Sequence, residues 1–472
     1  MSFSSSYRPA LDHTTLGGAF YDVVEPAEFP GHILRYRNQK AAGTVGLDTL
    51  TDDEWIAHFG RFQPLPGSLP HPLALRYHGH QFRQYNPDLG DGRGFLFAQL
   101  RDCNGRLLDL GTKGSGRTPW SRGGDGRLTL KGGVREILAA SMLEGLGVDT
   151  SRAFSLIETG EELERHDEPS PTRSAVLVRL SHSHIRIGTF QRLAATGDMA
   201  SIPKLVTYVL ETYYPEITVS EQDNPALLLF GAVCAKVARV GAQWMAAGFV
   251  HGVLNTDNIA ITGESFDYGP WRFLPRFDPS FTAAYFDHNG LYSYGNQPQA
   301  LMWSLARLAE CLLENAPHAG LSEILSSFPE LYETELDAAW CRRLGVCRVS
   351  AEDDRALRQA VTLFMEESGI PFHALPFDWY GGAVSMRRAM ASPRSAFYAE
   401  PGFQPVRALL GSRDALPGFR PDHAYFSSEI PCDMLIGTVE TLWSALSAND
   451  DWTALDAVLG RIGIMSDALG TG

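Results

Sequence analysis

His251-Gly252-Val253-Leu254-Asn255-Thr256-Asp257-Asn258, followed by Asp267-Tyr268-Gly269, is the stretch of this chain that decides its expected fold. Upstream of it, the apolar run 226–247 repeats hydrophobic side chains at helical spacing. Gly248 directly follows that run, as the C-terminal cap of a helix does. The sequence therefore predicts a long buried helix that leads into a polar loop, and then a short hairpin with Asp267 at its end.

The polar loop resembles the catalytic loop of protein kinases, in which His-Arg-Asp, four residues and Asn are followed later by Asp-Phe-Gly. Aligned on His251, Asn258 and Asp267 fall on the two metal-binding positions. The kinase general base falls on Val253, which cannot accept a proton. A carboxylate does lie beside the metal position, at Asp257. Either the protein is catalytically inactive, or it performs a different nucleotide reaction with Asp257.

The composition indicates a globular protein of one large domain or two lobes, with 472 residues, 44% of them hydrophobic and 20% charged. A net charge of −15 argues against a general nucleic-acid-binding surface. No uninterrupted run of about 18 or more apolar residues occurs, so no membrane span is expected. The six cysteines form no Cys-x-x-Cys pair, which is typical of reduced thiols in a cytoplasmic protein.

A basic, glycine-rich segment at 113–135 interrupts the acidic trend of the chain. It contains six cations and seven glycines, and Asp125 is its only acid. A smaller cluster, Gly90-Asp91-Gly92-Arg93, lies upstream. Glycines let backbone N–H groups approach an anion closely, and guanidinium groups bind phosphate oxygens in pairs. A flexible, solvated surface loop is the alternative, but the two clusters together favour a phosphate-binding cradle.

Three further charged residues stand in apolar surroundings. Glu136 lies on a helix expected over Val134 to Leu146, where it either pairs with Lys113 or is an ordinary solvated charge. Arg179 ends a buried strand, and Arg186 follows it. Each arginine is either a surface ion-pair partner or a buried anion contact.

His78 and His80 have no candidate for a third metal ligand near them in the sequence, and we interpret them as structural.

A series of motifs resembles the selenoprotein O family of pseudokinases from about Phe20 to Leu312. The N-terminal ones are Gly-His-Gln-Phe (79–82), Leu-Gly-Asp-Gly-Arg (89–93), Lys-Gly-Ser-Gly-x-Thr-Pro-Trp-Ser-Arg (113–122), Gly-Asp-Gly-Arg (124–127) and Arg-Glu (135–136). His-Gly-Val-Leu-Asn-Thr-Asp-Asn (251–258) and Asp-Tyr-Gly-Pro (267–270) follow. The sequence departs from the family pattern at Arg83, where many members have Gly.

This resemblance implies a bilobal, protein-kinase-like α+β fold that binds ATP in a flipped orientation. We expect a wrapping segment at 1–85, an N-lobe with a mixed sheet at 86–195, and a helical C-lobe with the catalytic loop at 196–472. The C-lobe includes a helix expected over Gln299 to Asn315. The family transfers AMP to hydroxyl side chains of proteins, and some bacterial members use UTP.

Residue by residue, the resemblance implies that Asp257 is the proton acceptor and that Asn258 and Asp267 hold Mg²⁺ or Mn²⁺. The implied nucleotide contacts are Gly90, Gly92, Arg93, Lys113, Asp125, Gly126, Arg179, Arg186 and Asp267. The expected function is AMP transfer from ATP, or UMP transfer from UTP, to Ser, Thr or Tyr of partner proteins. Nucleic acid and membranes are not expected partners.

Two other functions stay open. One is a nucleotide-binding scaffold without catalysis, which the loss of the kinase base at Val253 favours. The other is phosphate transfer to a small molecule, as in aminoglycoside-kinase-like folds. Those proteins have His-Gly-Asp in the loop, which would place Asp where Val253 stands, so this function is the least favoured.

Overall fold

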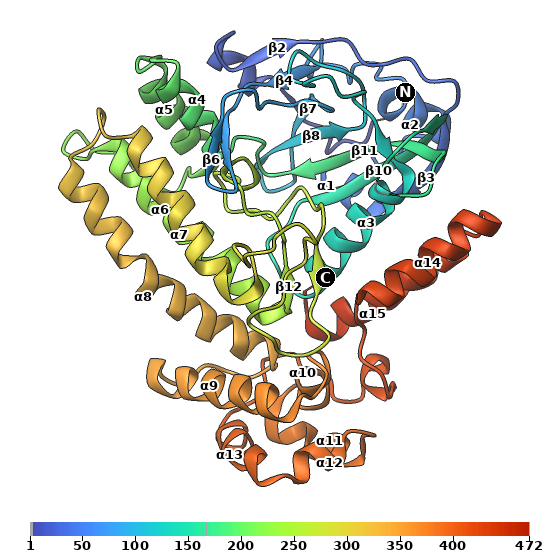
Figure 1. The fold of residues 1–472 in the computed structure, drawn as a ribbon, viewed down its shortest axis with the longest axis vertical. Helices are drawn as coiled ribbons and strands as arrows, with labels where there is room; N and C mark the ends of the chain where they lie inside the picture. Colours follow the sequence, from blue (N-terminus) through green and yellow to red (C-terminus); the bar gives the residue numbers. More distant parts are fainter. Residues whose placement is uncertain (1–2, 167, 472) are drawn as a thin grey trace.

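The structure is a computed structural model that describes residues 3–166 and 168–471. A nine-stranded sheet lies at one end and most of the helices at the other (Figure 1). The strand order is β2-β4-β7-β8-β11-β10-β3, with β1 on β7 and β9 on β11. The strands are β1 (Pro9–Ala10), β2 (Tyr21–Val23), β3 (Ile33–Arg37), β4 (Leu73–Leu75), β7 (Leu96–Arg101), β8 (Leu107–Lys113), β9 (Leu128–Thr129), β10 (Arg152–Leu163) and β11 (Thr172–Ser181).

Every strand pair described in this sheet is antiparallel, so the expectation of a mixed sheet was wrong. Short turns join β7 to β8, and a hairpin connection joins β10 to β11. Such connections produce antiparallel neighbours, whereas a parallel pair needs a long crossover. The structure is compatible with the α+β class, and the likeness to protein kinases stays a prediction.

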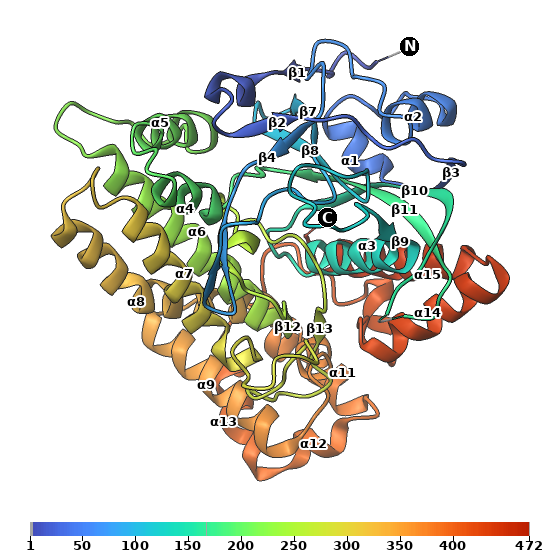
Figure 2. The same cartoon turned by 45° about the horizontal axis from the view of Figure 1, so that its top comes forward.

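Both faces of the central strands are buried. Along β11, Val176 and Val178 face one hydrophobic core, which also contains Trp55. The alternate residue Leu177 faces the other core, which contains Ile137. This alternation follows from the two-residue period of a strand. Figure 2 shows α1 (Gln39–Thr44) and α2 (Asp52–Phe59) on one side of β10 and β11, and α3 (Leu130–Gly145) on the other.

The first 85 residues do more than surround the sheet, because they contribute β1, β2, β3 and β4 to it. They also supply α2, which begins with a capping box between Thr51 and Glu54. A separate hairpin follows, made of β5 (Gly79–Gln81) and β6 (Gln84–Asn86). The described part of this segment is therefore integral to the strand-rich end of the molecule.

The helical end is built around α6 (Pro225–Ala247), which ends at Gly248 in the left-handed conformation, as expected. The expected helix 134–146 begins earlier, at Leu130, because the Thr129 side chain caps it. The helix expected over 299–315 spans Gln297–Cys311 (α7). The other helices are α4 (Ile187–Ala195), α5 (Ser201–Tyr213), α8 (His318–Arg343), α9 (Ala351–Ser368), α10 (Ala374–Asp378), α11 (Met386–Ala391), α12 (Ser395–Ala399), α13 (Gln404–Gly411), α14 (Ile436–Asn449) and α15 (Thr453–Leu469).

By length and composition alone, α6 would be able to cross a membrane, with a mean hydropathy of 1.5. The sequence contains no uninterrupted apolar run of this length, so this property of α6 was not expected. More than half of that stretch is buried inside the protein, where α6 packs against α5, α7 and α8. The core helix of a folded domain has the same properties, so this helix is weak evidence for a membrane span.

The polar loop after α6 lies between β12 (Phe249–Val250) and β13 (Arg272–Phe273), which pair with each other. The residues between the loop and Asp267 do not form the expected hairpin. Instead, Ala260 bridges to Arg186, and Ser265 bridges to Thr150. These bridges anchor the segment to the strand-rich end of the molecule, so Asp267 lies against the sheet.

The left-handed cap at Gly248 gives a test of this junction. A Cβ built on Gly248 would lie 2.6 Å from a carbon of the Phe372 ring. Gly248→Ala should therefore destabilise the protein by more than the roughly 1–2 kcal/mol that the left-handed conformation costs an ordinary residue. Urea unfolding measures this loss. The control Gly231→Ala lies in α6 with open space around it, and it should be neutral or stabilising by up to about 1 kcal/mol. Equal stability of the two variants would contradict this account of the helix end.

Candidate active site

A buried ion network joins the sheet, α3 and the polar loop. Lys113, the last residue of β8, places its Nζ 2.5 Å from Oε1 of Glu136 on α3. The same Nζ lies 2.7 Å from Oδ1 of Asp267. Lys113 and Glu136 are only 6% and 2% exposed. Buried charges are stable only when they are paired, so the three side chains hold one another in place.

Arg179 of β11 adds a second cation to this network. Its Nη1 lies 3.4 Å from Oδ1 of Asp267 and 3.9 Å from Oε2 of Glu136. Burial alone would raise the pKa of Asp267, but Lys113, Arg179 and Arg93 hold it well below its usual range. Asp267 also has a φ of +60°, a strained value for a non-glycine residue. Such strain is typical of functional positions whose surroundings enforce it.

Arg186 forms a second cluster, around the polar loop. This buried side chain donates from Nη1 to the backbone oxygen of Asp257 at 3.0 Å. Its Nη2 lies 3.4 Å from Oδ1 of Asp91. The guanidinium group stacks on the rings of Tyr77 and Phe266, 4.2 and 4.9 Å from their centroids. Phe266 also contacts the Arg179 guanidinium, so one ring joins the two clusters.

Asp257 lies in a 3₁₀ turn over Thr256–Asn258 and is 8% exposed. Its Oδ1 is buried and has no hydrogen-bond partner among the described residues. Burial raises the pKa of this carboxyl to about 6, although Arg186 opposes the shift. A carboxylate with an unengaged oxygen in a polar loop is chemically suited to accept a proton.

The residues proposed to hold a metal are both oxygen ligands. Asn258 donates from Nδ2 to the backbone oxygen of Val253 at 3.0 Å, which leaves its amide oxygen for a ligand. Asp267 supplies a carboxylate. Across residues 3–166 and 168–471, no group of three or more His, Cys, Asp or Glu side chains could hold a metal. Two protein oxygens fit Mg²⁺ or Mn²⁺ completed by phosphate oxygens and water, which is how nucleotide-bound Mg²⁺ is commonly held.

Glycines of the two glycine-rich segments, 90–93 and 113–135, have close neighbours. A Cβ on Gly90 would lie 2.4 Å from Trp120 Cγ, and one on Gly92 would lie 2.7 Å from the Trp120 oxygen. Gly126 has a φ of +72° and would meet the Gly116 backbone at 2.3 Å. These glycines let the two glycine-rich segments pack together. This structural role exists alongside any contact with phosphate.

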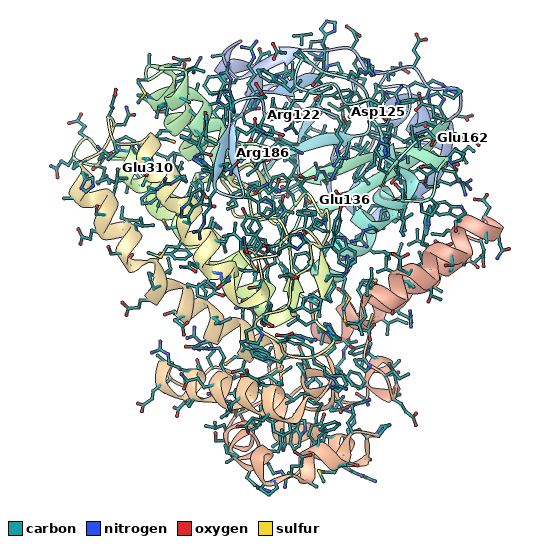
Figure 3. The ribbon with its side chains drawn as sticks, in the orientation of Figure 1. Arg122, Asp125, Glu136, Glu162, Arg186 and Glu310 are labelled. Carbon is teal, nitrogen blue, oxygen red and sulfur yellow. The ribbon has the colours of Figure 1, made fainter. Side chains whose placement is uncertain are left out.

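A cavity of about 460 Å³ adjoins the ion network, and Arg93, Lys113, Arg127 and Glu136 are among its lining residues. Asp125 instead lines a neighbouring hollow and pairs with Arg165, at 2.8 Å. In Figure 3, Glu136 and Arg186 lie nearer the helical end than Arg122 and Asp125 do.

The structure thus brings Lys113, Arg179 and Asp267 together, and it places Arg186 on the backbone of Asp257. It does not bring Asp125 into direct contact with either cluster. Sequence reasoning missed Asp91 and the aromatic rings under the arginines. The two glycines around Asp91 were a signal for the first, whereas the rings had no local signal.

Comparison with known proteins shows which family this chain resembles. A family profile described as "Protein adenylyltransferase SelO" matches residues 2–379. A Synechococcus sp. protein called "Protein nucleotidyltransferase YdiU" is 52% identical over 478 residues, which cover 96% of this chain and 94% of that protein. Proteins with the same name from Gloeobacter violaceus and Synechocystis sp. are 45% and 52% identical, over 97% and 72% of this chain and 94% and 71% of their own lengths.

The ion network gives a stability prediction. Lys113→Met should destabilise the protein by about 3 kcal/mol or more, because it leaves Glu136 buried without its closest partner. Adding Glu136→Gln should recover part of that loss. Urea unfolding of the two variants measures both effects. The control is Lys131→Met, because Lys131 pairs with Glu440 at the surface and should contribute less than about 1 kcal/mol. Equal losses in Lys113→Met and Lys131→Met would refute the network's role.

Proposed function

This chain belongs to the SelO family, and from that premise we propose that it transfers AMP from ATP to Ser, Thr or Tyr hydroxyls of target proteins. Protein nucleotidyl transfer is the activity that the family and the names of its relatives support. The observation that carries the finer proposal is the buried, unpartnered Oδ1 of Asp257, a residue whose backbone oxygen accepts a hydrogen bond from Arg186. UTP is the alternative donor.

The nucleotide is proposed to bind between the ion network of Lys113 and the cluster around Arg186. Lys113, Arg179 and Arg186 are buried cations that converge on this region from β8, β11 and the start of α4. Arg93 extends the positive charge into the adjoining cavity. Each charge-assisted hydrogen bond to a phosphate oxygen contributes about 1.5–3 kcal/mol. Mg²⁺ or Mn²⁺ held by Asn258 and Asp267 would neutralise further phosphate charge when bound.

The Asp257 carboxylate then has one chemical task. It accepts the proton of the target hydroxyl while the hydroxyl oxygen forms a bond to the α-phosphorus. The bond from the α-phosphorus to the bridging oxygen of the β-phosphate breaks, and pyrophosphate leaves with its negative charge paired to the cations. Val253 at the kinase base position explains why the γ-phosphate is not the proposed point of attack. Arg186 holds the Asp257 backbone, and so it links phosphate binding to the position of the base.

A nucleotide-binding scaffold without catalysis is the second candidate, and Val253 is the observation that favours it. The two functions differ in what they require of Asp257. Catalysis requires one carboxylate oxygen that is free to accept a proton, whereas a scaffold requires only that the loop is folded. The absence of any described hydrogen bond to Oδ1 favours catalysis, because an Asp with a purely structural role normally accepts hydrogen bonds from backbone N–H groups.

Asp257→Asn tests the base directly. The substitution preserves shape but removes the proton acceptor, so AMP transfer should fall by about 10²–10⁴-fold. Nucleotide affinity and melting temperature should stay near the wild-type values, because Lys113, Asn258 and Asp267 are unchanged. Transfer of α-labelled AMP to protein measures the rate, and calorimetry measures binding. An Asp257→Asn enzyme that is less stable yet fully active per folded molecule would assign the residue a structural role.

Asp267→Asn tests the metal site. Transfer should be lost, and the part of ATP affinity that depends on Mn²⁺ or Mg²⁺ should disappear. ATP affinity measured in excess chelator is the internal control. This metal-free affinity should not fall, because removing a negative charge beside the phosphates does not weaken ATP binding. Calorimetric titrations with and without metal make this comparison. A normal metal-dependent gain in affinity would remove Asp267 from the metal site.

A further inference from the structure

The β5–β6 hairpin carries the Gly-His-Gln-Phe motif, to which the mechanism above assigns no role. Phe82 and Arg83 form its two-residue turn, with φ values of +49° and +63°. Such turns favour Gly or Asn, because other side chains are strained there. Arg83 therefore stands at a turn position where glycine would be unstrained. A strained turn persists only where surrounding contacts impose it, and the contacts here lead to the polar loop.

Two backbone groups of the hairpin bind the residues immediately before Asp257. The His80 N–H donates to Oγ1 of Thr256 at 2.7 Å. The Phe82 N–H donates to Oδ1 of Asn255 at 3.1 Å. Both donors are main-chain groups of the hairpin and both acceptors are side chains of the loop, so the bonds depend on the hairpin's conformation and on the rotamers of Asn255 and Thr256. The hairpin therefore holds the two loop side chains that immediately precede the proposed base.

Gln191 of α4 closes this contact into a ring of hydrogen bonds. The Thr256 hydroxyl accepts from His80 and donates to Oε1 of Gln191, at 2.5 Å. The Gln191 Nε2 then donates to Nδ1 of the His80 ring, at 2.7 Å. Each group has one defined role as donor or acceptor, so the ring is fully satisfied. The ring is partly buried. A satisfied polar network in such a place specifies one arrangement of its members, and here Thr256 is a member.

Gly79 brings the hairpin against the base itself. A Cβ built on Gly79 would lie 3.0 Å from Oδ1 and 3.2 Å from Cβ of Asp257. The Gly79 backbone does not have a positive φ. Glycine is therefore favoured at this position because of the close approach to Asp257, and to Leu89, whose Cδ1 would lie 3.2 Å from that Cβ, and not because of backbone conformation.

We propose that the β5–β6 hairpin, together with Gln191, is a positioning element for the Asp257 carboxylate. The backbone bonds from His80 and Phe82 set the loop, and the bare Cα of Gly79 forms the wall against which the carboxylate rests. The hairpin thereby limits the orientations that the Asp257 carboxylate can take toward a target hydroxyl. This inference rests on the proposed function of Asp257 as the base.

Gly79→Ala is the principal test. The added methyl group would lie 3.0 Å from Oδ1 of Asp257 and 3.2 Å from Cδ1 of Leu89, so these side chains must shift by a few tenths of an ångström. A misplacement of about 1 Å can lower a rate by about 10²-fold, and we expect this smaller shift to lower it by about 10-fold. We expect kcat for AMP transfer to fall by about that factor, while the Kd for ATP with metal and the melting temperature stay near wild type. Gly231→Ala, in open space on α6, is the matched control and should transfer AMP at the wild-type rate. A wild-type kcat in folded Gly79→Ala would overturn the proposal.

A second pair of variants covers the case in which Gly79→Ala does not fold. Thr256→Val removes the hydroxyl from the hydrogen-bonded ring, whereas Thr256→Ser retains it. The proposal predicts a lower kcat with unchanged ATP affinity in Thr256→Val and recovery in Thr256→Ser. Equal kcat values per folded molecule in the two variants would contradict it. Full activity in Asp257→Asn would instead reject the proposed base, so failure of the function and failure of the positioning role are distinguishable.

Discussion

The buried pairing of Lys113 with Glu136 and Asp267 is the interaction on which the rest of this structure depends. It joins β8, α3 and the polar loop after α6, three parts of the chain that are far apart in sequence. Arg179 provides a second cation, so two carboxylates and two cations lie together, all buried except the Asp267 side chain, which is 27% exposed. None of these charges is stable there alone. The network therefore requires the sheet and the polar loop to come together in one arrangement.

Two aspartates of the candidate site, Asp257 and Asp267, lie in opposite electrostatic environments. Cations surround Asp267 and hold its pKa well below the usual range. Asp257 is buried with an unpartnered oxygen, and burial raises its pKa to about 6. Environments that separate the pKa values of neighbouring carboxyl groups commonly assign them different tasks. In the proposed reaction, Asp267 stays charged and binds metal while Asp257 accepts a proton. The β5–β6 hairpin and Arg186 hold the loop that carries Asp257, and so they hold Asp257 in its own environment.

The sequence predicted the parts of this account that depend on local pattern. The apolar period and Gly248 predicted α6. The sequence left open whether Glu136 pairs with Lys113 or is an ordinary solvated charge, and the structure shows the pair. The sheet was predicted as mixed and is antiparallel, because strand direction depends on connections that local patterns do not encode. Gln191 gave no signal, since its partners His80 and Thr256 lie far from it in sequence. The nucleotide and metal roles of the site residues stay predictions.

Transfer of label from ATP marked separately at its α- and γ-phosphates tests the central claim most directly. The wild-type chain is incubated with Mg²⁺ or Mn²⁺ and protein substrates, and the label retained on protein is measured, with α-labelled UTP in parallel. The account predicts retention of the α label and none of the γ label, and loss of the α label in Asp257→Asn. Retention of the γ label would show phosphate transfer, and retention of neither label from either nucleotide would show a scaffold. Either result would contradict the account.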